Sequence, residues 1–180
     1  MIAARTPTLL RASLRTASQV TPRVGQASIP AARSITNLAK KQYTAHGRAE
    51  GKGRDGHALL VGDQVGLEVS LGLPKELGGN GAGNNPEELF SLAYSSCFLS
   101  ALQLVARNAK EQLPSDTSVD ALVHIGPPEG SEGFAIAVDL TIKSSLSDKN
   151  KLQSLVDQAH QVCPYSNATR NNVPVSINVQ

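Results

Sequence analysis

Several residue types and motifs are scarce or missing in this 180-residue chain. It has no tryptophan, one methionine and two cysteines, Cys97 and Cys163. The cysteines do not form a Cys-x-x-Cys motif, which argues against a thioredoxin-like disulfide exchanger. Neither they nor the four histidines have the spacing of metal ligands, so we expect no bound metal. No stretch approaches 18 consecutive apolar residues, and we therefore expect no membrane span.

Acidic residues are absent from the N-terminal part, where Glu50 is the first. A segment rich in Arg, Ser, Thr and Ala but free of acids is typical of a mitochondrial transit peptide. The alternative is a disordered basic arm that binds nucleic acid or acidic lipid. The basic residues are spaced singly rather than in blocks, which disfavours that alternative. We therefore expect no nucleic-acid partner. Residues 1–42 contain seven of these residues: Arg5, Arg11, Arg15, Arg23, Arg33, Lys40 and Lys41.

We divide the chain accordingly into a transit peptide (residues 1–35), a linker (36–42) and one domain (43–180), located in the mitochondrial matrix. Residues 43–180 have ten basic and fifteen acidic residues, a formal charge of −5. Structural disulfides are rare in a reducing compartment. Any pairing of the two cysteines is therefore expected to be transient and chemical.

Residues 84–110 predict a long helix centred on Cys97. Asn85 can cap it, Pro86 suits the first helical position, and Glu88 can complete a capping box. Apolar residues recur at three- and four-residue steps, and most of the other positions are apolar too, so the helix should be buried on most sides. We expect a second copy of the chain to cover what the short strands of one domain leave exposed.

The preceding glycine-rich stretch, residues 73–86, lacks the features of a nucleotide site. It has no Gly-Lys-Ser/Thr and no strand–helix–strand context. We interpret it as a connector or a subunit-packing loop.

Alternating apolar residues predict strands within residues 43–51, 58–61, 65–71, 118–125, 134–142 and 173–179. A second helix is expected to be capped by Ser147 and to stop at Pro164. Pro174 indicates the start or the edge of the last strand. Because strands and helices do not alternate regularly, the fold class is α+β with mostly antiparallel pairing.

Four of the six phenylalanines and tyrosines lie near a cysteine. Phe90, Tyr94 and Phe98 follow the Cys97 helix at steps of four, and Tyr165 is two residues after Cys163. This pattern indicates a core or dimer contact, which could also form the wall of an apolar substrate pocket.

Cys97 alone could be a small buried hydrophobe, which is common for cysteine. A catalytic role requires help, because a thiol with a pKa near 8.5 is only about 3% thiolate at pH 7. Neither cysteine lies where its helix dipole would stabilise a thiolate. Arg54, between Gly53 and Asp55, is the best candidate for a cation beside Cys97.

The stretch 162–172, VCPYSNATRNN, looks too polar and turn-forming for a core. Together with NPEELFSLAYSSCF, YTA and GRDG, it closely resembles the organic hydroperoxide resistance (Ohr) subgroup of the OsmC/Ohr family. The resemblance covers residues 43–180. It implies antiparallel sheets around a long cysteine-bearing helix, in an intertwined homodimer with active sites at the interface.

The resemblance also implies a thiol peroxidase that reduces organic and fatty-acid hydroperoxides to alcohols. Cys97 would be oxidised to a sulfenic acid, and Cys163 would resolve it as a disulfide. Arg54 would stabilise the thiolate, and Glu87 would orient Arg54. The family binds no cofactor and is recycled by dihydrolipoyl groups, such as dihydrolipoamide or the lipoylated proteins of dehydrogenase complexes.

Helix geometry limits how these residues can meet. Glu87 and Cys97 are ten residues apart, about 15 Å along a straight helix. Either Arg54 bridges toward both, the helix is broken, or Glu87 of one subunit serves the site of the other.

Two other functions deserve comparison. A cysteine hydrolase needs a histidine base, yet His124 falls on a strand without an evident partner, and His160 suits a surface or packing role; His46 and His57 are the other candidates. A non-catalytic ligand-binding or redox-sensing module of the same fold would keep ligand binding when Arg54 is replaced by Ala, whereas a peroxidase would lose most of its rate.

We predict that residues 1–35 direct the protein to mitochondria and are then removed. A fluorescent protein fused to the C-terminus of the full chain should enter mitochondria, and the N-terminus should be cleaved near residue 35. A version without residues 1–35 is the matched control and should stay in the cytosol. Cytosolic location of the full chain, or a leader that remains uncleaved, would contradict this prediction.

Overall fold

The computed structural model describes residues 37–62 and 66–180. These residues belong to one compact unit, Thr36–Gln180. The predicted transit peptide lies outside the described residues, as does Val65 of the predicted third strand.

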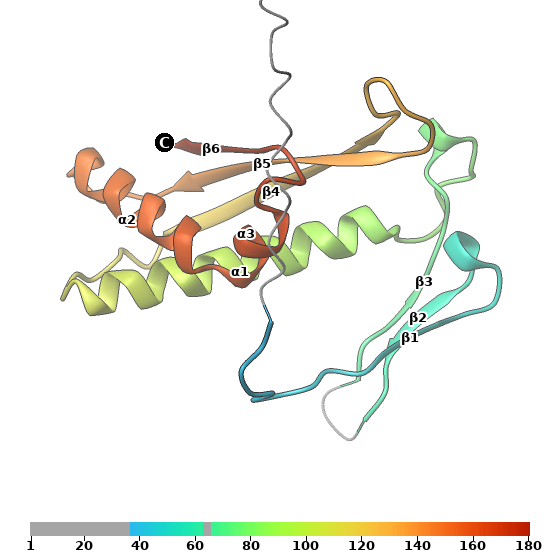
Figure 1. The fold of residues 1–180 in the computed structure, drawn as a ribbon, viewed down its shortest axis with the longest axis horizontal. Helices are drawn as coiled ribbons and strands as arrows, with labels where there is room; N and C mark the ends of the chain where they lie inside the picture. Colours follow the sequence, from blue (N-terminus) through green and yellow to red (C-terminus); the bar gives the residue numbers. More distant parts are fainter. Residues whose placement is uncertain (1–36, 63–65) are drawn as a thin grey trace, which may run out of the picture. The chain divides into compact units, whose positions relative to one another are not determined.

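In the described residues, two three-stranded sheets are combined with one long helix and two shorter helices (Figure 1). The first sheet is antiparallel, in the order β1-β2-β3. In the second, β4 pairs antiparallel with β5, and β6 pairs parallel with β5 at the edge. The elements are β1 (Gly47–Glu50), β2 (His57–Leu60), β3 (Glu68–Ser70), α1 (Pro86–Asn108), β4 (Ser118–Gly126), β5 (Ala135–Lys143), α2 (Lys149–Val162), α3 (Pro164–Thr169) and β6 (Val175–Val179), with short 3-10 turns η1 (Gly53–Asp55) and η2 (Lys75–Leu77).

The predicted α+β class and element order are confirmed, except that α3 was not predicted. Parallel pairing of β5 with β6 requires a crossover connection, which α2 and α3 provide. The edge position of β6 directly after Pro174 agrees with the sequence-based expectation.

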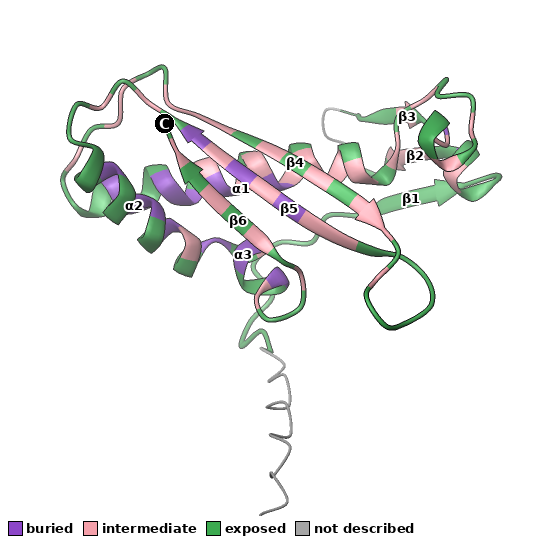
Figure 2. Ribbon diagram, turned by 90° about the horizontal axis from the view of Figure 1, so that it is seen from above, coloured by how far each residue is buried: buried purple, intermediate pink, exposed green. Residues whose placement is uncertain are grey.

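The core lies where α1 and α2 pack against one face of the second sheet. Figure 2 shows buried segments on α1, α2 and the central strand β5. Alternate residues of β5 point into this core, as the period of two predicts. The core includes Phe98, Leu102, Val138, Leu140, Ile142, Leu152 and Val156, all of them almost inaccessible to solvent.

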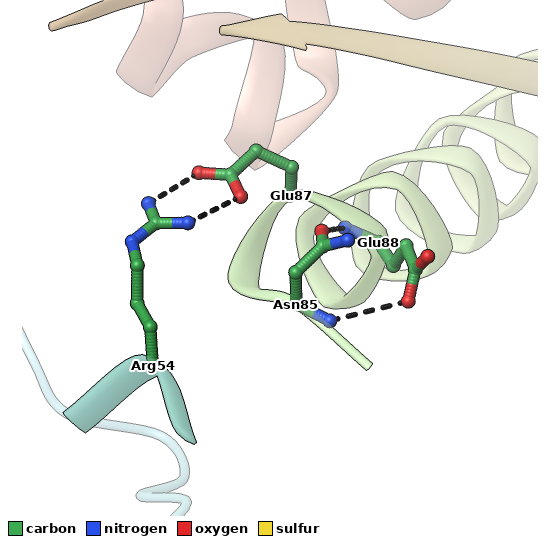
Figure 3. A network of polar contacts seen from close by, with 4 residues as sticks. All are labelled: Arg54, Asn85, Glu87 and Glu88. Carbon is green, nitrogen blue, oxygen red and sulfur yellow. Dashed lines mark hydrogen bonds and ion pairs between the residues drawn. The ribbon is translucent and has the colours of Figure 1, made fainter. Parts of the chain in front are cut away.

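The predicted start of α1 is confirmed. The Asn85 side chain accepts from the Glu88 N–H at 2.9 Å, the Glu88 carboxylate accepts from the Asn85 N–H at 3.2 Å, and Pro86 is the first helical residue (Figure 3). The helix then continues without a break to Asn108. For α2 the predicted cap is wrong: Asp148, not Ser147, caps it, by accepting from the Lys151 N–H. A carboxylate also suits the positive end of the helix dipole.

By length and composition alone, α1 could cross a membrane. In the described unit, 33% of its most apolar window is buried. Core helices of folded proteins share this signature. In this fold α1 packs Phe98 and Leu102 against the second sheet and α2, while Leu92 is 68% and Leu104 46% exposed. The apolar surface that remains is the part that we expect a second copy of the chain to cover.

Candidate active site

The two cysteines lie side by side although they come from distant segments. Cys97 is on α1, and Cys163 is the extended residue between α2 and α3, with φ −64° and ψ 124°. Pro164, directly after it, is the first residue of α3, so α2 ends and a new helix begins on either side of Cys163. The Cys163 thiol donates to the Cys97 sulfur at 3.7 Å, and both thiols are free. A short shift of either side chain would bring the sulfurs to bonding distance.

The two sulfurs differ in solvent access. Cys163 is fully buried, whereas Cys97 is half-buried. Burial raises the pKa of the Cys97 thiol; the backbone N–H of Tyr165 opposes this by donating to the sulfur, and the neighbouring Cys163 thiol adds to the rise. Cys97 is therefore a weak nucleophile in this arrangement and needs a positive charge from elsewhere.

Arg54 and Glu87 form a bidentate ion pair (Figure 3). The Arg54 Nη1 donates to Glu87 Oε2 at 2.8 Å, and Nη2 donates to Oε1 at 2.6 Å. These hydrogen bonds lower the pKa of the Glu87 carboxyl and raise that of the Arg54 guanidinium. The pair fixes the guanidinium in one plane, which prepares it to meet an anionic partner.

The glycine-rich loop between β3 and α1 helps to position this ion pair. Asp55, next to Arg54, accepts from the Leu73 N–H at 3.0 Å, and Gly72 donates to the Asn84 carbonyl at 2.8 Å. A Cβ on Gly79 would lie 1.9 Å from the Leu73 carbonyl oxygen. These contacts join η1 to the start of α1, so the loop has a structural role in the described unit.

The predicted quartet of site residues is thus split into two pairs. In the part of the chain that the structure describes, Arg54 bonds to Glu87 and makes no hydrogen bond or ion pair with Cys97. Glu87 lies in the first turn of α1, and Cys97 is ten residues further along the same unbroken helix, about 15 Å away. A broken helix is therefore excluded as the means of uniting them.

Three of the four predicted pocket aromatics form one cluster. Phe90, Tyr94 and Tyr165 have ring centroids 5.8 Å apart in each pair. Phe98 lies instead 6.5 Å from the His160 ring. Tyr94 and Phe98 are fully buried in the core, while Phe90 and Tyr165 are half-buried. Substrate contact by these four residues stays a prediction.

The segment after Cys163 is not the polar turn that its composition indicated. Residues 164–169 form α3, and the Ser166 and Thr169 side chains are buried. They can be buried because the Tyr94 hydroxyl lies 3.0 Å from Ser166 Oγ and 3.3 Å from Thr169 Oγ1. Ser166 and Thr169 follow Pro164 and are three residues apart, a spacing that could have indicated a helix with one polar face.

No histidine in the described residues hydrogen-bonds to Cys97, which disfavours the hydrolase. His124 does have a partner, contrary to expectation: its Nε2 lies 3.1 Å from Asp139 Oδ2, but both side chains are about half exposed. The pKa of His160 is lowered by burial and by the Arg170 charge. The described residues contain no group of three potential metal ligands.

Comparisons with known proteins agree on one family for this chain. A protein-family model described as OsmC-like protein matches residues 78–178. An organic hydroperoxide resistance protein of Xanthomonas axonopodis pv. citri is 49% identical over 77% of this chain and 94% of its own length. The chain belongs to the OsmC/Ohr family.

Solved structures agree with this assignment. A putative organic hydroperoxide resistance protein from Vibrio cholerae, with captopril bound in one of the active sites, is 40% identical with a TM-score of 0.72, over 79% of this chain and 95% of the other. An organic hydroperoxide resistance protein from Elizabethkingia anophelis is 43% identical with a TM-score of 0.69, over 78% and 98%. The predicted OsmC/Ohr fold is confirmed.

The ion pair leads to a pH-dependent prediction. Because the folded-state pKa of Glu87 is below its ordinary value, the pair stabilises the fold above that ordinary value, and this contribution is lost as pH falls toward the folded-state pKa. Partial exposure of Arg54 limits it to about 1 kcal/mol. Urea unfolding should show wild type more stable than Glu87→Gln at pH 7, and the difference should shrink toward pH 3. Glu76→Gln, on exposed η2, should show no such difference; a pH-independent difference for Glu87→Gln would contradict the prediction.

Proposed function

We propose that this protein is a thiol peroxidase that reduces organic hydroperoxides, including those of fatty acids. The observation that carries the proposal is the pair of free sulfurs 3.7 Å apart, one half-buried and one fully buried. It occurs in a chain whose relatives are named organic hydroperoxide resistance proteins. The half-buried rings of Phe90 and Tyr165, 5.8 Å apart, offer an apolar surface that suits an organic substrate rather than hydrogen peroxide.

The first step is attack of the Cys97 thiolate on the O–O bond. The sulfur takes the distal oxygen and becomes a sulfenic acid, and the leaving alkoxide is protonated to an alcohol. In the second step the Cys163 thiolate attacks the Cys97 sulfur, and hydroxide leaves and is protonated to water. One hydroperoxide is thereby reduced by two electrons and the thiol pair is oxidised to a disulfide.

A dithiol is needed to return the disulfide to two thiols. We assign this role to a dihydrolipoyl group, carried by dihydrolipoamide or a lipoylated protein of a dehydrogenase complex. Its first thiolate forms a mixed disulfide and its second closes a cyclic disulfide, which releases both protein thiols. The site uses no bound cofactor in this scheme. The captopril found in an active site of the Vibrio cholerae relative supports access of small molecules to such a site.

The functional protein is a homodimer in this proposal. α1 is apolar around most of its surface, yet only a third of its most apolar window is buried in one chain. A pocket of about 620 Å³ between the first sheet and α1 is lined mainly by apolar residues, of which Leu60, Leu67 and Leu92 are strongly exposed. A second copy would remove this surface from water, which is the main driving force of association.

The dimer also unites the two pairs of site residues. Within one chain, Arg54 is hydrogen-bonded to Glu87 in the first turn of α1, and Cys97 lies about 15 Å further along the same helix. In a symmetric dimer, Arg54 and Glu87 of one subunit can face Cys97 of the other, and the reverse contact follows from the two-fold axis. The guanidinium would then lower the pKa of the Cys97 thiol against the effect of burial.

Steady-state hydroperoxide consumption tests the activity. Protein lacking residues 1–35 should turn over tert-butyl and fatty-acid hydroperoxides faster than hydrogen peroxide, with dihydrolipoamide as reductant. Cys97→Ser should abolish turnover, and Arg54→Ala should slow it by about 10²–10³-fold, as expected for loss of a charge that stabilises the reacting anion. Arg107→Ala, on the exposed last turn of α1, is the matched control. No turnover with any dithiol, from a folded protein with both thiols reduced, would favour the non-catalytic binding or sensing module.

Mixed dimers test the shared site. Chains carrying Cys97→Ser and chains carrying Arg54→Ala, each nearly inactive alone, should regain activity when they are unfolded together and refolded, because the mixed dimer has one complete site. Mixing Cys97→Ser with Cys163→Ser chains should restore nothing, since both sulfurs come from the same chain. Failure of the first mixture to exceed its parents would place Arg54 and Cys97 of one site in the same subunit.

A further inference from the structure

The hydroxyl of Tyr94 is fully buried and joins α1 to α3. It lies 3.0 Å from Ser166 Oγ and 3.3 Å from Thr169 Oγ1. The Thr169 hydroxyl donates its single hydrogen to the Tyr165 carbonyl at 2.9 Å, with the Ser166 carbonyl at 3.2 Å. Tyr94 must then donate to Thr169 and Ser166 must donate to Tyr94, so that each of the three hydroxyls donates its one hydrogen to a different acceptor.

This chain of hydroxyls lies one helical turn from each sulfur. Tyr94 precedes Cys97 by three residues on α1, and Ser166 follows Cys163 by three residues. The hydroxyl chain thus fixes the segment that carries Cys163 against the segment that carries Cys97.

The backbone of Cys163 ties its position to both neighbouring helices, because its N–H donates to the Ala159 carbonyl of α2 at 2.8 Å and its carbonyl accepts from the Asn167 N–H of α3 at 2.9 Å. It lies in the extended conformation between two helices, and α3 has only six residues, too few to be stable without tertiary contacts. Among the residues that the structure describes, the side-chain hydrogen bonds between α1 and α3 are those of Tyr94 with Ser166 and Thr169.

We propose that Tyr94 is a positioning residue for the second chemical step: its hydroxyl holds α3 so that Cys163 stands ready to attack the oxidised Cys97. This inference rests on the proposed function. The first step needs Cys97 and the peroxide but not the position of Cys163. In the second step the Cys163 thiolate forms the S–S bond and the sulfenic oxygen leaves as water after protonation, which requires the sulfurs to be close.

Loss of the Tyr94 hydroxyl should therefore separate the two steps. Tyr94→Phe keeps the ring that packs on Phe90 and Tyr165. Sulfenic acid formation should keep its rate, whereas disulfide formation should slow by about ten- to a hundredfold, the order expected for a misplacement of about 1 Å. The longer-lived sulfenic acid should then be oxidised further by excess hydroperoxide to the sulfinic acid, which mass spectrometry detects at Cys97.

Rapid-mixing experiments with one equivalent of tert-butyl hydroperoxide measure both steps, by peroxide loss and by disappearance of free thiols. Tyr43→Phe removes the same group from a side chain that is 83% exposed and should match wild type. Equal disulfide rates in Tyr94→Phe and wild type would overturn the proposal.

A second variant separates positioning from general stability. Tyr94→Phe leaves the buried Ser166 hydroxyl without its partner, which destabilises the fold, while Tyr94→Phe/Ser166→Ala removes both groups and should recover much of that stability. The double variant should still form the disulfide slowly, because the link between α1 and α3 is still missing. Recovery of both stability and disulfide rate would show that Tyr94 is only structural.

Diamide makes the test independent of the proposed function. This azo compound adds to one thiol, and the second thiol then displaces it as a hydrazine, so the disulfide forms without peroxide. Slow disulfide formation in Tyr94→Phe with diamide would support the positioning role even in a protein that does not reduce hydroperoxides. Wild-type rates with diamide would overturn it even in an active peroxidase.

Discussion

The unbroken helix α1 is the constraint on which the rest of the structure depends. Its capping box fixes where it begins, so Glu87 lies in the first turn and Cys97 about 15 Å further along. The two groups keep this distance because the helix has neither a break nor a kink-forming proline in its interior. In the proposed dimer, a second copy of the helix brings the ion pair to the thiol, and the exposed apolar surface of α1 is where that copy would pack.

The distance between the Arg54–Glu87 ion pair and Cys97 also bears on the pKa of the thiol. Burial raises the pKa of the Cys97 thiol, which disfavours the reactive thiolate in a single chain. The Arg54 guanidinium, already oriented by Glu87, is the charge that could reverse this shift. In the proposed dimer, activation of the thiol and burial of the apolar surface become one event, so an isolated subunit would be protected from unspecific oxidation.

Local patterns in the sequence predicted most of the fold. The caps of α1, the alternation in β4 and β5 and the stop at Pro164 are encoded within a few residues, and the structure confirms them. α3 was missed because the partner of its buried hydroxyls, Tyr94, lies 72 and 75 residues away in the sequence, so the local spacing of Ser166 and Thr169 did not show that this polar face is buried. The proximity of Cys97 and Cys163 likewise came only from the resemblance to the Ohr subgroup, since spacing in sequence does not report contact in space.

The most direct test of this account is a mass measurement on the reduced protein after one equivalent of an organic hydroperoxide. Alkylation of remaining thiols, followed by peptide mapping without reduction, should find both thiols lost and one peptide pair joined through Cys97 and Cys163 of the same chain. Two thiols that remain available to the alkylating reagent, or a disulfide only between different chains, would contradict the central claim that these two sulfurs form the peroxide-reducing centre.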